Sequence, residues 1–336
     1  MMLDTRTGRV ERMIVVGNSP EAIAVDPRSA QAFVATDNGI MSVLDTRTGR
    51  VVRSVALAGP LSAVVVDHVA SHVLVAGNLG NGGFLANSGF VTVLAARDGR
   101  ILHTAFIRFR PGALAVDAPL ARAVVTGWRI IHQGTIPIAA GEVSVLDTRS
   151  GRIVRTVPIG RNLGPVGIDT HTRRAFVADL DSSGGVGHID MLDAASGRLL
   201  RIVKLAFAPI ALTVSEATGR VFVCGQGAPG AVVVLDAYTG QLISTTTSYA
   251  GMILKPWSTT IVADETRKHI IMVGSQGTDI LDSRNGVILR TLSVPGDSVA
   301  IDNQSGHIFT SYSKDDSLAS TTTQKTGHTT ILDIKI

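Results

Sequence analysis

Short apolar runs alternate with turn-forming residues along the whole chain, and each run has the length of a strand. A typical unit begins with a proline and an apolar run that ends in Asp, as in Pro20 to Asp26. Three further runs follow it, at residues 32–35, 41–45 and 51–55. Their β-branched and aromatic residues favour strands that are covered on both faces. The pattern therefore predicts an all-β chain built from units of four strands.

One short phrase recurs through the chain and sets the length of the unit. It is Leu-Asp or a near variant, followed in most copies by a Gly four residues after the Asp. The eight copies begin at Leu3, Leu44, Leu94, Leu146, Leu192, Leu235, Leu281 and Leu332. They are separated by 41 to 52 residues, and a period of that size made of short strands is typical of a β-propeller.

Turn chemistry explains the phrase itself. Residues 45–49 and 147–151 lie between the third and fourth strands of their units, where a hairpin turn is expected. The side chain of Asp45 can accept backbone N–H bonds, and Gly49 can adopt a left-handed conformation that residues with a Cβ atom disfavour. The commonest motif in the chain is therefore architectural and points to no ligand.

Counting strands gives seven blades, because the chain starts within one turn and ends within a third strand. The last unit lacks its fourth strand, and the segment 9–16 is available for that place. Pairing of this segment with the three carboxy-terminal strands would close the ring and remove open sheet edges. We therefore expect one domain over residues 1–336, a seven-bladed β-propeller of four-stranded antiparallel blades, whose closing blade combines residues 9–16 and 297–336.

The repeat resembles that of the bacterial YVTN-repeat propellers, the YncE-like family. The resemblance rests on Val43-Leu44-Asp45-Thr46-Arg47-Thr48-Gly49, Val16-Gly17-Asn18-Ser19-Pro20, Ala24-Val25-Asp26 and Phe33-Val34-Ala35-Thr36-Asp37. It covers the whole chain, although no strand spells Tyr-Val-Thr-Asn and the copy at Leu94 lacks its Asp. The resemblance implies the propeller fold and no particular activity, because the matching residues are turn and core positions.

Composition excludes a few classes of chemistry. Apolar residues make up 45% of the 336 positions and charged residues 17%, which suits a large core of stacked sheets. Cys224 is the only cysteine, so an intramolecular disulfide is excluded, and no Gly-x-Ser-x-Gly motif or phosphate-binding glycine loop is present. Apolar stretches have strand length, so we expect no membrane span. No signal peptide is visible in the sequence. The sequence therefore predicts no particular cellular compartment, and an exported form is the alternative if the start is trimmed.

Candidate functional residues lie where the repeat is interrupted. Four units carry long insertions between their second and third strands, at residues 77–90, 127–142, 179–188 and 312–328. In a propeller these connections are expected near the mouth of the central channel, and loops of this kind often carry function. The candidate ligand-binding residues are Asn78, Arg129, His132, Asp179, Asp181, His188, Lys314 and His328.

A metal site is one interpretation of these residues. Asp179 and Asp181 stand in a segment rich in Ser and Gly, where spaced carboxylates would suit Ca²⁺ or another divalent ion; a solvated turn is the alternative. Imidazoles and a guanidinium at a channel mouth would bind a metal or a carboxylate. No two histidines have local ligand spacing, so their convergence depends on the fold.

Two classes of function remain. The first is a non-catalytic scaffold, without a cofactor, that holds a small molecule or a partner protein at the channel mouth and the long loops. The alternative is a lactonase-type or lyase-type propeller enzyme with a divalent metal ion in the central channel. Nucleic-acid binding through a basic rim is a minor alternative, because the net charge is +4 but aromatic residues are only 4%. We expect a monomer.

Overall fold

The computed structural model describes residues 2–3, 10–12, 14, 16, 19–26, 28–79, 87–133, 136–180, 186–225, 230–248, 261–274, 276–294, 298–301, 308–313 and 327–332. This part of the chain consists of strands and turns without a helix, which confirms the all-β prediction. The described residues accordingly include no helix long and apolar enough to cross a membrane.

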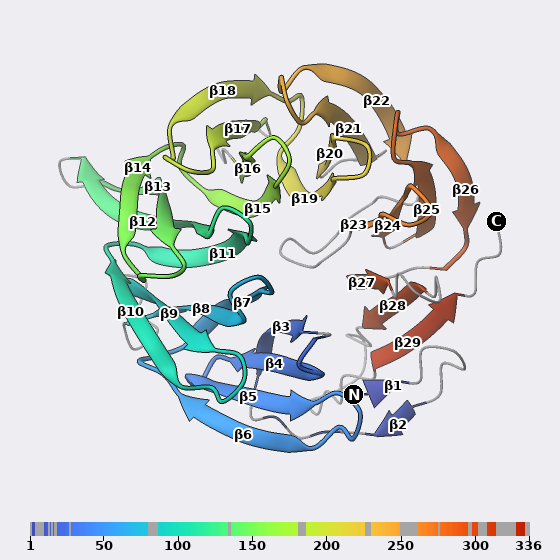
Figure 1. Cartoon of the computed structure of the whole chain (residues 1–336). Coiled ribbons are helices and arrows are strands. Elements are labelled where there is room, and N and C mark those ends of the chain that lie inside the picture. Colours follow the sequence, from blue (N-terminus) through green and yellow to red (C-terminus); the bar gives the residue numbers. More distant parts are fainter. Residues whose placement is uncertain are drawn as a thin grey trace, which may run out of the picture. The chain divides into compact units, whose positions relative to one another are not determined.

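Six sheets among the described residues have four antiparallel strands, and each is formed by four consecutive strands of the chain (Figure 1). Consecutive strands pair because short turns join them, so each sheet is a local product of its own stretch of sequence. Sheets of this kind are the blades of a β-propeller. The four-stranded repeat unit predicted from the sequence is therefore confirmed.

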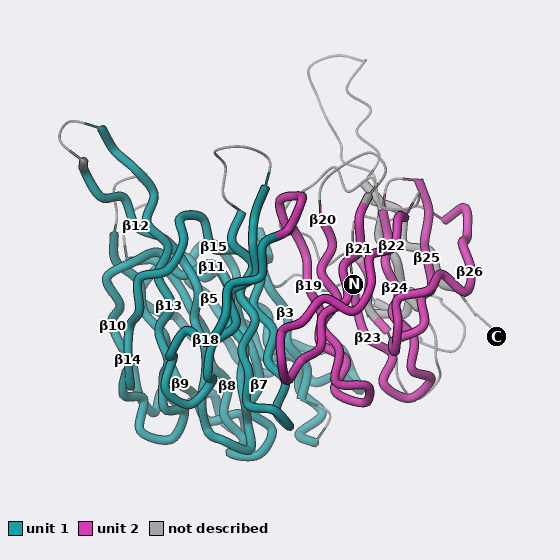
Figure 2. The backbone as a smooth tube through the Cα atoms, turned by 90° about the horizontal axis from the view of Figure 1, so that it is seen from above, with its two compact units in different colours: residues 1–2, 12–204 teal, residues 3–11, 205–336 magenta. Residues whose placement is uncertain are grey.

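Contacts divide the chain into two compact units, residues 1–2 with 12–204 and residues 3–11 with 205–336 (Figure 2). The first unit holds four blades, whose inner strands β3, β7, β11 and β15 are neighbours in that order. The strands are β3 (Pro20–Asp26), β4 (Gln31–Thr36), β5 (Ile40–Asp45), β6 (Val51–Ala56), β7 (Leu61–Asp67), β8 (His72–Asn78), β9 (Gly89–Ala95), β10 (Ile101–Ile107), β11 (Arg110–Asp117), β12 (Arg122–Gln133), β13 (Ile136–Asp147), β14 (Ile153–Pro158), β15 (Leu163–Asp169), β16 (Arg174–Asp179), β17 (His188–Asp193) and β18 (Leu199–Lys204).

The second unit holds two four-stranded blades and a sheet of three strands. Its strands are β19 (Pro209–Ser215), β20 (Arg220–Gly225), β21 (Gly230–Asp236), β22 (Leu242–Ser248), β23 (Ile261–Asp264), β24 (His269–Gly274), β25 (Gly277–Asp282), β26 (Ile288–Leu292), β27 (Ser298–Ile301), β28 (Ile308–Ser313) and β29 (Gly327–Leu332).

The three-stranded sheet agrees with the expected last unit, which has no fourth strand of its own. Among the described residues β1 (Met2–Leu3) pairs with β2 (Val10–Arg12). Closure of the ring by residues 9–16, the count of seven blades and the single domain stay predictions.

The core of each blade lies around its second and third strands. Phe33, Phe90, Phe176 and Phe222 are fully buried on these strands, whereas the outer fourth strands expose residues such as Val52. Apolar clusters fill the space between neighbouring blades of the first unit. The fourth strand is an outer edge of each four-stranded sheet, so its apolar side chains can remain in contact with water.

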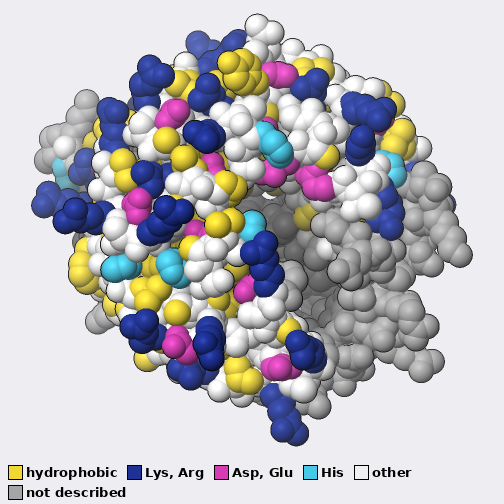
Figure 3. Space-filling view, in the orientation of Figure 1, with side chains coloured by type: hydrophobic (Ala, Val, Ile, Leu, Met, Phe, Trp, Pro, Cys, Tyr) yellow, Lys and Arg dark blue, Asp and Glu magenta, His cyan; other side chains and the backbone are white. Residues whose placement is uncertain are grey.

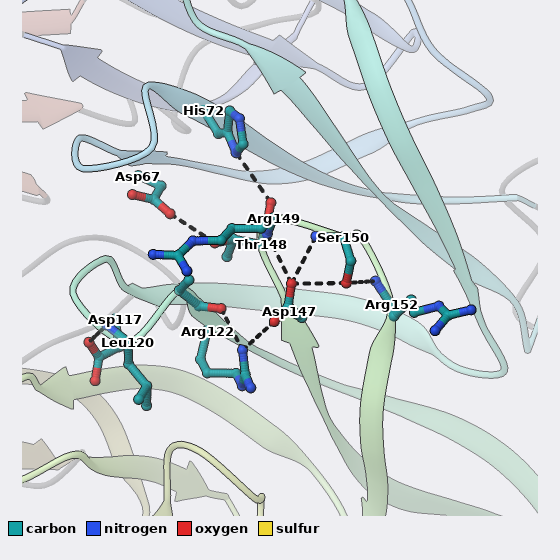
Figure 4. Close-up of polar contacts among 11 residues, drawn as sticks. Asp67, His72, Asp117, Leu120, Arg122, Asp147, Thr148, Arg149, Ser150 and Arg152 are labelled. Atoms are coloured by element: carbon teal, nitrogen blue, oxygen red, sulfur yellow. Dashed lines mark hydrogen bonds and ion pairs between the residues drawn. The ribbon is translucent and has the colours of Figure 1, made fainter.

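The hairpin turn between β13 and β14 shows the predicted chemistry (Figure 4). Oδ1 of Asp147 accepts hydrogen bonds from the backbone N–H of Arg149 and Ser150, at 3.1 and 2.8 Å. Gly151 closes the turn with φ +68°, and its N–H donates to the carbonyl of Asp147. The N–H of Ser150 is the main cause that holds the pKa of Asp147 below its ordinary value. The same turn recurs at residues 45–49, 193–197, 236–240 and 282–286.

A buried polar link joins the second and third blades (Figure 4). The hydroxyl of Thr148 donates to Oδ2 of Asp67 at 2.9 Å, and both residues are 0% exposed. Nδ1 of His72 lies 3.2 Å from the carbonyl oxygen of Thr148. His72, the first residue of β8, therefore makes a structural contact with the hairpin turn of the third blade.

Replacement of Thr148 by Val is expected to lower the free energy of unfolding by about 1–3 kcal/mol, because the buried oxygen of Asp67 loses its donor. Urea denaturation measures the change. Thr48→Val is the control, since the hydroxyl of Thr48 donates to Oδ1 of Asp45 within its own turn at an exposed site. An equal loss in both variants would contradict a special role for the buried link.

The insertion at residues 127–142 is an extension of the blade and not the expected loop. β12 and β13 stay paired from Arg122 with Asp147 to Gln133 with Ile136, and this hairpin projects beyond the other strands of its unit (Figure 2). Asn87 holds it from the second blade: its amide accepts from the N–H of Ile130 and donates to the carbonyl of Ile130, both at 2.7 Å. The side-chain amide of Asn87 thus makes the same pair of hydrogen bonds with Ile130 that a residue of a neighbouring strand would make.

Candidate functional site

The end of the second strand is a position where most blades require Gly. It is Gly77 in β8, Gly127 in β12 and Gly225 in β20. A Cβ atom at Gly127 would lie 2.0 Å from the carbonyl oxygen of Arg110, so the neighbouring strand β11 leaves no room for a side chain. In β16 the same position is Asp179. β4 carries Thr36 at this position, so the fourth blade must provide space for a carboxylate that the blades with Gly exclude.

The loop that leads into β15 provides that space. Backbone N–H groups of Arg161 and Asn162 donate to Oδ2 and Oδ1 of Asp179, both at 3.1 Å. Gly160 has φ +59°, and a Cβ atom there would lie 1.9 Å from Oδ2 of Asp179. Only Gly allows this approach. The carboxylate of Asp179, which is 1% exposed, is thus fixed by the backbone.

His188 and Asp190 complete a cluster on the same face of the blade. His188 is opposite Asp179 in the ladder between β16 and β17, and Asp190 is two residues further along β17. Side chains two residues apart on a strand point to the same side. Nε2 of His188 lies 3.2 Å from Oδ2 of Asp179 and 3.5 Å from Oδ1 of Asp190. All three potential ligand atoms lie within 4.8 Å of one another.

Asp190 is the unusual member of the cluster. Its side chain is 2% exposed, and Oδ2 is buried without a hydrogen-bond partner among the described residues. Burial raises its pKa from the ordinary 3.8 to about 6; the charge of His188 opposes this change and that of Asp179 adds to it. The cluster therefore holds a carboxylate that its own surroundings do not satisfy.

Asp279 shows what a satisfied carboxylate looks like at the same repeat position. It occupies the matching place in β25 and is equally buried. Its oxygens accept hydrogen bonds from the hydroxyls of Ser248 at 2.5 Å and Thr291 at 2.6 Å. Around Asp190 the corresponding register positions are Ile159 and Ile202, which have no hydroxyl to donate.

The second and third blades satisfy this position with hydroxyl groups, whereas β21 carries the apolar Val233 there. Thr92 pairs with Thr104 at 3.1 Å, and Ser144 pairs with Thr156 at 2.7 Å. In these two blades the fourth strand supplies a hydroxyl to the polar residue, but opposite Asp190 it supplies Ile202.

The structure brings Asp179 and His188 together, as the sequence analysis required for a site, and separates other candidates from them. Arg129 forms an ion pair with Glu142 beside a cavity of about 330 Å³, and the exposed His132 lies near the tip of the long hairpin, opposite Pro137. Asn78 is at the end of β8 in another blade. Asp181 and Lys314 lie outside the described residues, and so does the side chain of His328 in β29.

Asp190 was not predicted. A signal for it exists in the sequence, because aligned third strands carry Ser42, Thr92 and Ser144 where β17 carries Asp190. It is an acidic residue two positions after His188, in a strand that the sequence otherwise predicts to be buried, and this combination indicates the site. Asp190 lies within a strand and not in one of the insertions where candidate residues were expected.

Among the described residues, basic side chains form no comparable cluster on the face shown in Figure 3. On the face shown in Figure 3, Lys and Arg side chains are dispersed among acidic and apolar ones. The arginines of the hairpin turns, among them Arg149 and Arg152, lie beside carboxylates that accept hydrogen bonds from the turn backbone.

Comparisons with protein-family models and with curated proteins found no match. Many solved structures are similar to this chain, 1591 in all. One is hydrazine synthase from Kuenenia stuttgartiensis, with a TM-score of 0.65 and 14% sequence identity over 90% of this chain and 96% of that one. At this identity the likeness concerns the fold alone. Together with the four-stranded antiparallel sheets, it supports a β-propeller fold for the chain.

Proposed function

We propose that this chain is a non-catalytic binding scaffold of the YVTN-repeat propeller type, and that Asp179, His188 and Asp190 form its ligand-binding site. The observation that carries the proposal is the buried, unpartnered oxygen of Asp190. Such a group is costly unless something satisfies it, and buried polar groups in proteins are nearly always satisfied. Asp169 also buries an oxygen without a hydrogen-bond partner, but its other oxygen accepts two N–H bonds of a turn; among the described residues the polar contact of Asp190 is with His188.

The cluster defines the kind of ligand that it would take. Two carboxylates lie close together in a buried place, and among the described residues no Lys or Arg lies within ion-pair distance of either. A ligand must therefore supply positive charge or hydrogen-bond donors. The side chain of His188 is 23% exposed and gives the cluster its contact with solvent.

Native mass spectrometry tests the scaffold. Tag-free protein prepared without chelator is expected to carry a bound mass that the Asp190→Asn variant lacks. Asp279→Asn is the matched control, because Asp279 is an equally buried acid at the same repeat position whose oxygens are already satisfied. A wild-type chain with no bound mass, or with one that survives Asp190→Asn, would contradict the proposal.

A metal-dependent lactonase or lyase is the second candidate. One observation favours it: His188 combines access to solvent with contacts to two carboxylates, which suits an imidazole that exchanges protons with a substrate. In that case His188→Gln abolishes turnover of lactone or elimination substrates, whereas the scaffold has no turnover to lose.

A further inference from the structure

We propose that the ligand of this cluster is a divalent transition-metal ion, held by Nε2 of His188 and by carboxylate oxygens of Asp179 and Asp190. The assignment rests on the proposed function and names the chemical class of its ligand. It differs from the Ca²⁺ interpretation of the sequence, which paired Asp179 with Asp181 and had a solvated turn as its alternative.

The spacing of the three side chains fits a small metal ion. Ligand atoms that sit about 2.0–2.1 Å from a tetrahedral Zn²⁺ are separated from one another by roughly 3.4 Å. Nε2 of His188 is 3.2 Å from its nearest oxygen of Asp179 and 3.5 Å from that of Asp190. Two of the three separations thus match those that such an ion requires, and all three ligand atoms lie within 4.8 Å of one another.

Charge balance points the same way. The two carboxylates carry a combined charge of −2 when both are ionised, and the described residues offer them no ion pair with Lys or Arg. A divalent cation neutralises this charge at the point where it is buried. It also gives Oδ2 of Asp190 a partner, because carboxylates bind metals through one oxygen or both.

The ligand set selects among metals. Imidazole nitrogen suits Zn²⁺, Fe²⁺ and Ni²⁺ and carboxylates suit Mn²⁺ as well, whereas Ca²⁺ takes six to eight oxygen ligands. A site with one nitrogen and two carboxylates leaves a coordination position open, and the side chain of His188 is 23% exposed. Three protein ligands and one open position are the pattern of exchangeable or catalytic zinc sites.

The surroundings of Asp179 act as the supporting shell that metal sites need. The N–H groups of Arg161 and Asn162 fix both of its oxygens, and Gly160 allows the loop to approach. Hydrogen bonds of this type orient metal-binding carboxylates and restrict their rotation. Asp179 is therefore held in place before an ion arrives, while His188 and Asp190 are positioned by one strand.

The test uses the full chain after treatment with chelator and dialysis. Titration calorimetry and elemental analysis measure uptake of Zn²⁺ and Mn²⁺, with Ca²⁺ for comparison. We expect one equivalent of a transition metal per chain, and affinity reduced by roughly 10- to 100-fold or more in His188→Gln and Asp190→Asn. His171→Gln is the control, because His171 is in the same blade but its side chain is 72% exposed.

A second measurement does not depend on the variants' folding. Nitrogen chemical shifts of the wild-type histidines report metal binding at an individual ring, and the proposal predicts that the ring of His188 changes. Failure of the wild-type chain to take up any of these metals, or equal uptake by the His188 and Asp190 variants, would overturn it. If native mass spectrometry then shows an organic ligand that Asp190→Asn removes, the proposed binding scaffold is supported and the proposed metal ligand is refuted. If it shows no bound mass, both proposals are refuted.

Discussion

The Asp190→Asn variant is expected to be more stable than the wild-type chain at pH 8 in the absence of metal, by at most about 3 kcal/mol. Burial raises the pKa of Asp190 from 3.8 to about 6 in the folded chain. The unfolded chain has no such burial, so its carboxyl ionises near the ordinary value. The neutral amide of Asn removes the need to ionise a buried group.

The sign of the pH dependence follows from proton binding. Between about pH 4 and pH 6 the folded chain holds a proton on Asp190 that the unfolded chain has already released. The free energy of unfolding of the wild type therefore falls as the pH rises through this window, and it stays low above it. Urea denaturation at pH 4 and pH 8 is expected to show no difference between variant and wild type at the lower pH and the full difference at the higher.

Asp279→Asn provides the contrast. The carboxylate of Asp279 accepts two hydroxyl hydrogen bonds, so its replacement is expected to destabilise the chain at pH 8. Opposite signs at two equivalent positions would identify Asp190 as a residue retained at the expense of stability. A loss of stability in Asp190→Asn at pH 8 without metal would show that the carboxylate has a structural role.

Gly127→Ala is expected to lower the free energy of unfolding by about 3 kcal/mol or more. The new Cβ atom would lie 2.0 Å from the carbonyl oxygen of Arg110 and 2.7 Å from the ring of Phe109. A side chain can rotate away from such a contact, but a backbone carbonyl in a paired strand cannot. β11 would have to separate from β12 at this point.

Gly112→Ala is the control for this variant. Gly112 is exposed in the same strand pair, and a Cβ atom there meets only the carbonyl oxygen of Thr126, at 3.9 Å. We expect a change within about 0.5 kcal/mol. Thermal and urea denaturation of both variants measure the difference, and equal stability of Gly127→Ala and wild type would refute the steric argument.

Much of the fold was predictable because its signals are local. The turn at residues 147–151 forms through side-chain and backbone contacts within five residues, so its sequence identifies it wherever it occurs. The long hairpin of β12 and β13 was not predicted as strand. Its pairing depends on the amide of Asn87 from another blade as well as on its own residues, and no local pattern announces such a contact.

The candidate site was predictable only in part, and for the same reason. Asp179 and His188 stand at the two ends of an insertion, so an antiparallel hairpin places them opposite one another. Asp190 is distinguished by what surrounds it, since Asp279 has the same residue type and burial but two hydroxyl partners. That difference arises from neighbouring strands and appears only when the blades are aligned and packed.

The site is also compact along the chain, since every group that would hold the ligand lies between Gly160 and Asp190. Each blade pairs only strands that are adjacent in sequence. During synthesis this segment can therefore assemble as soon as the fourth blade leaves the ribosome, before translation of residues 205–336 is complete. An ion bound at that stage would stabilise the nascent fourth blade while the rest of the chain is still being made.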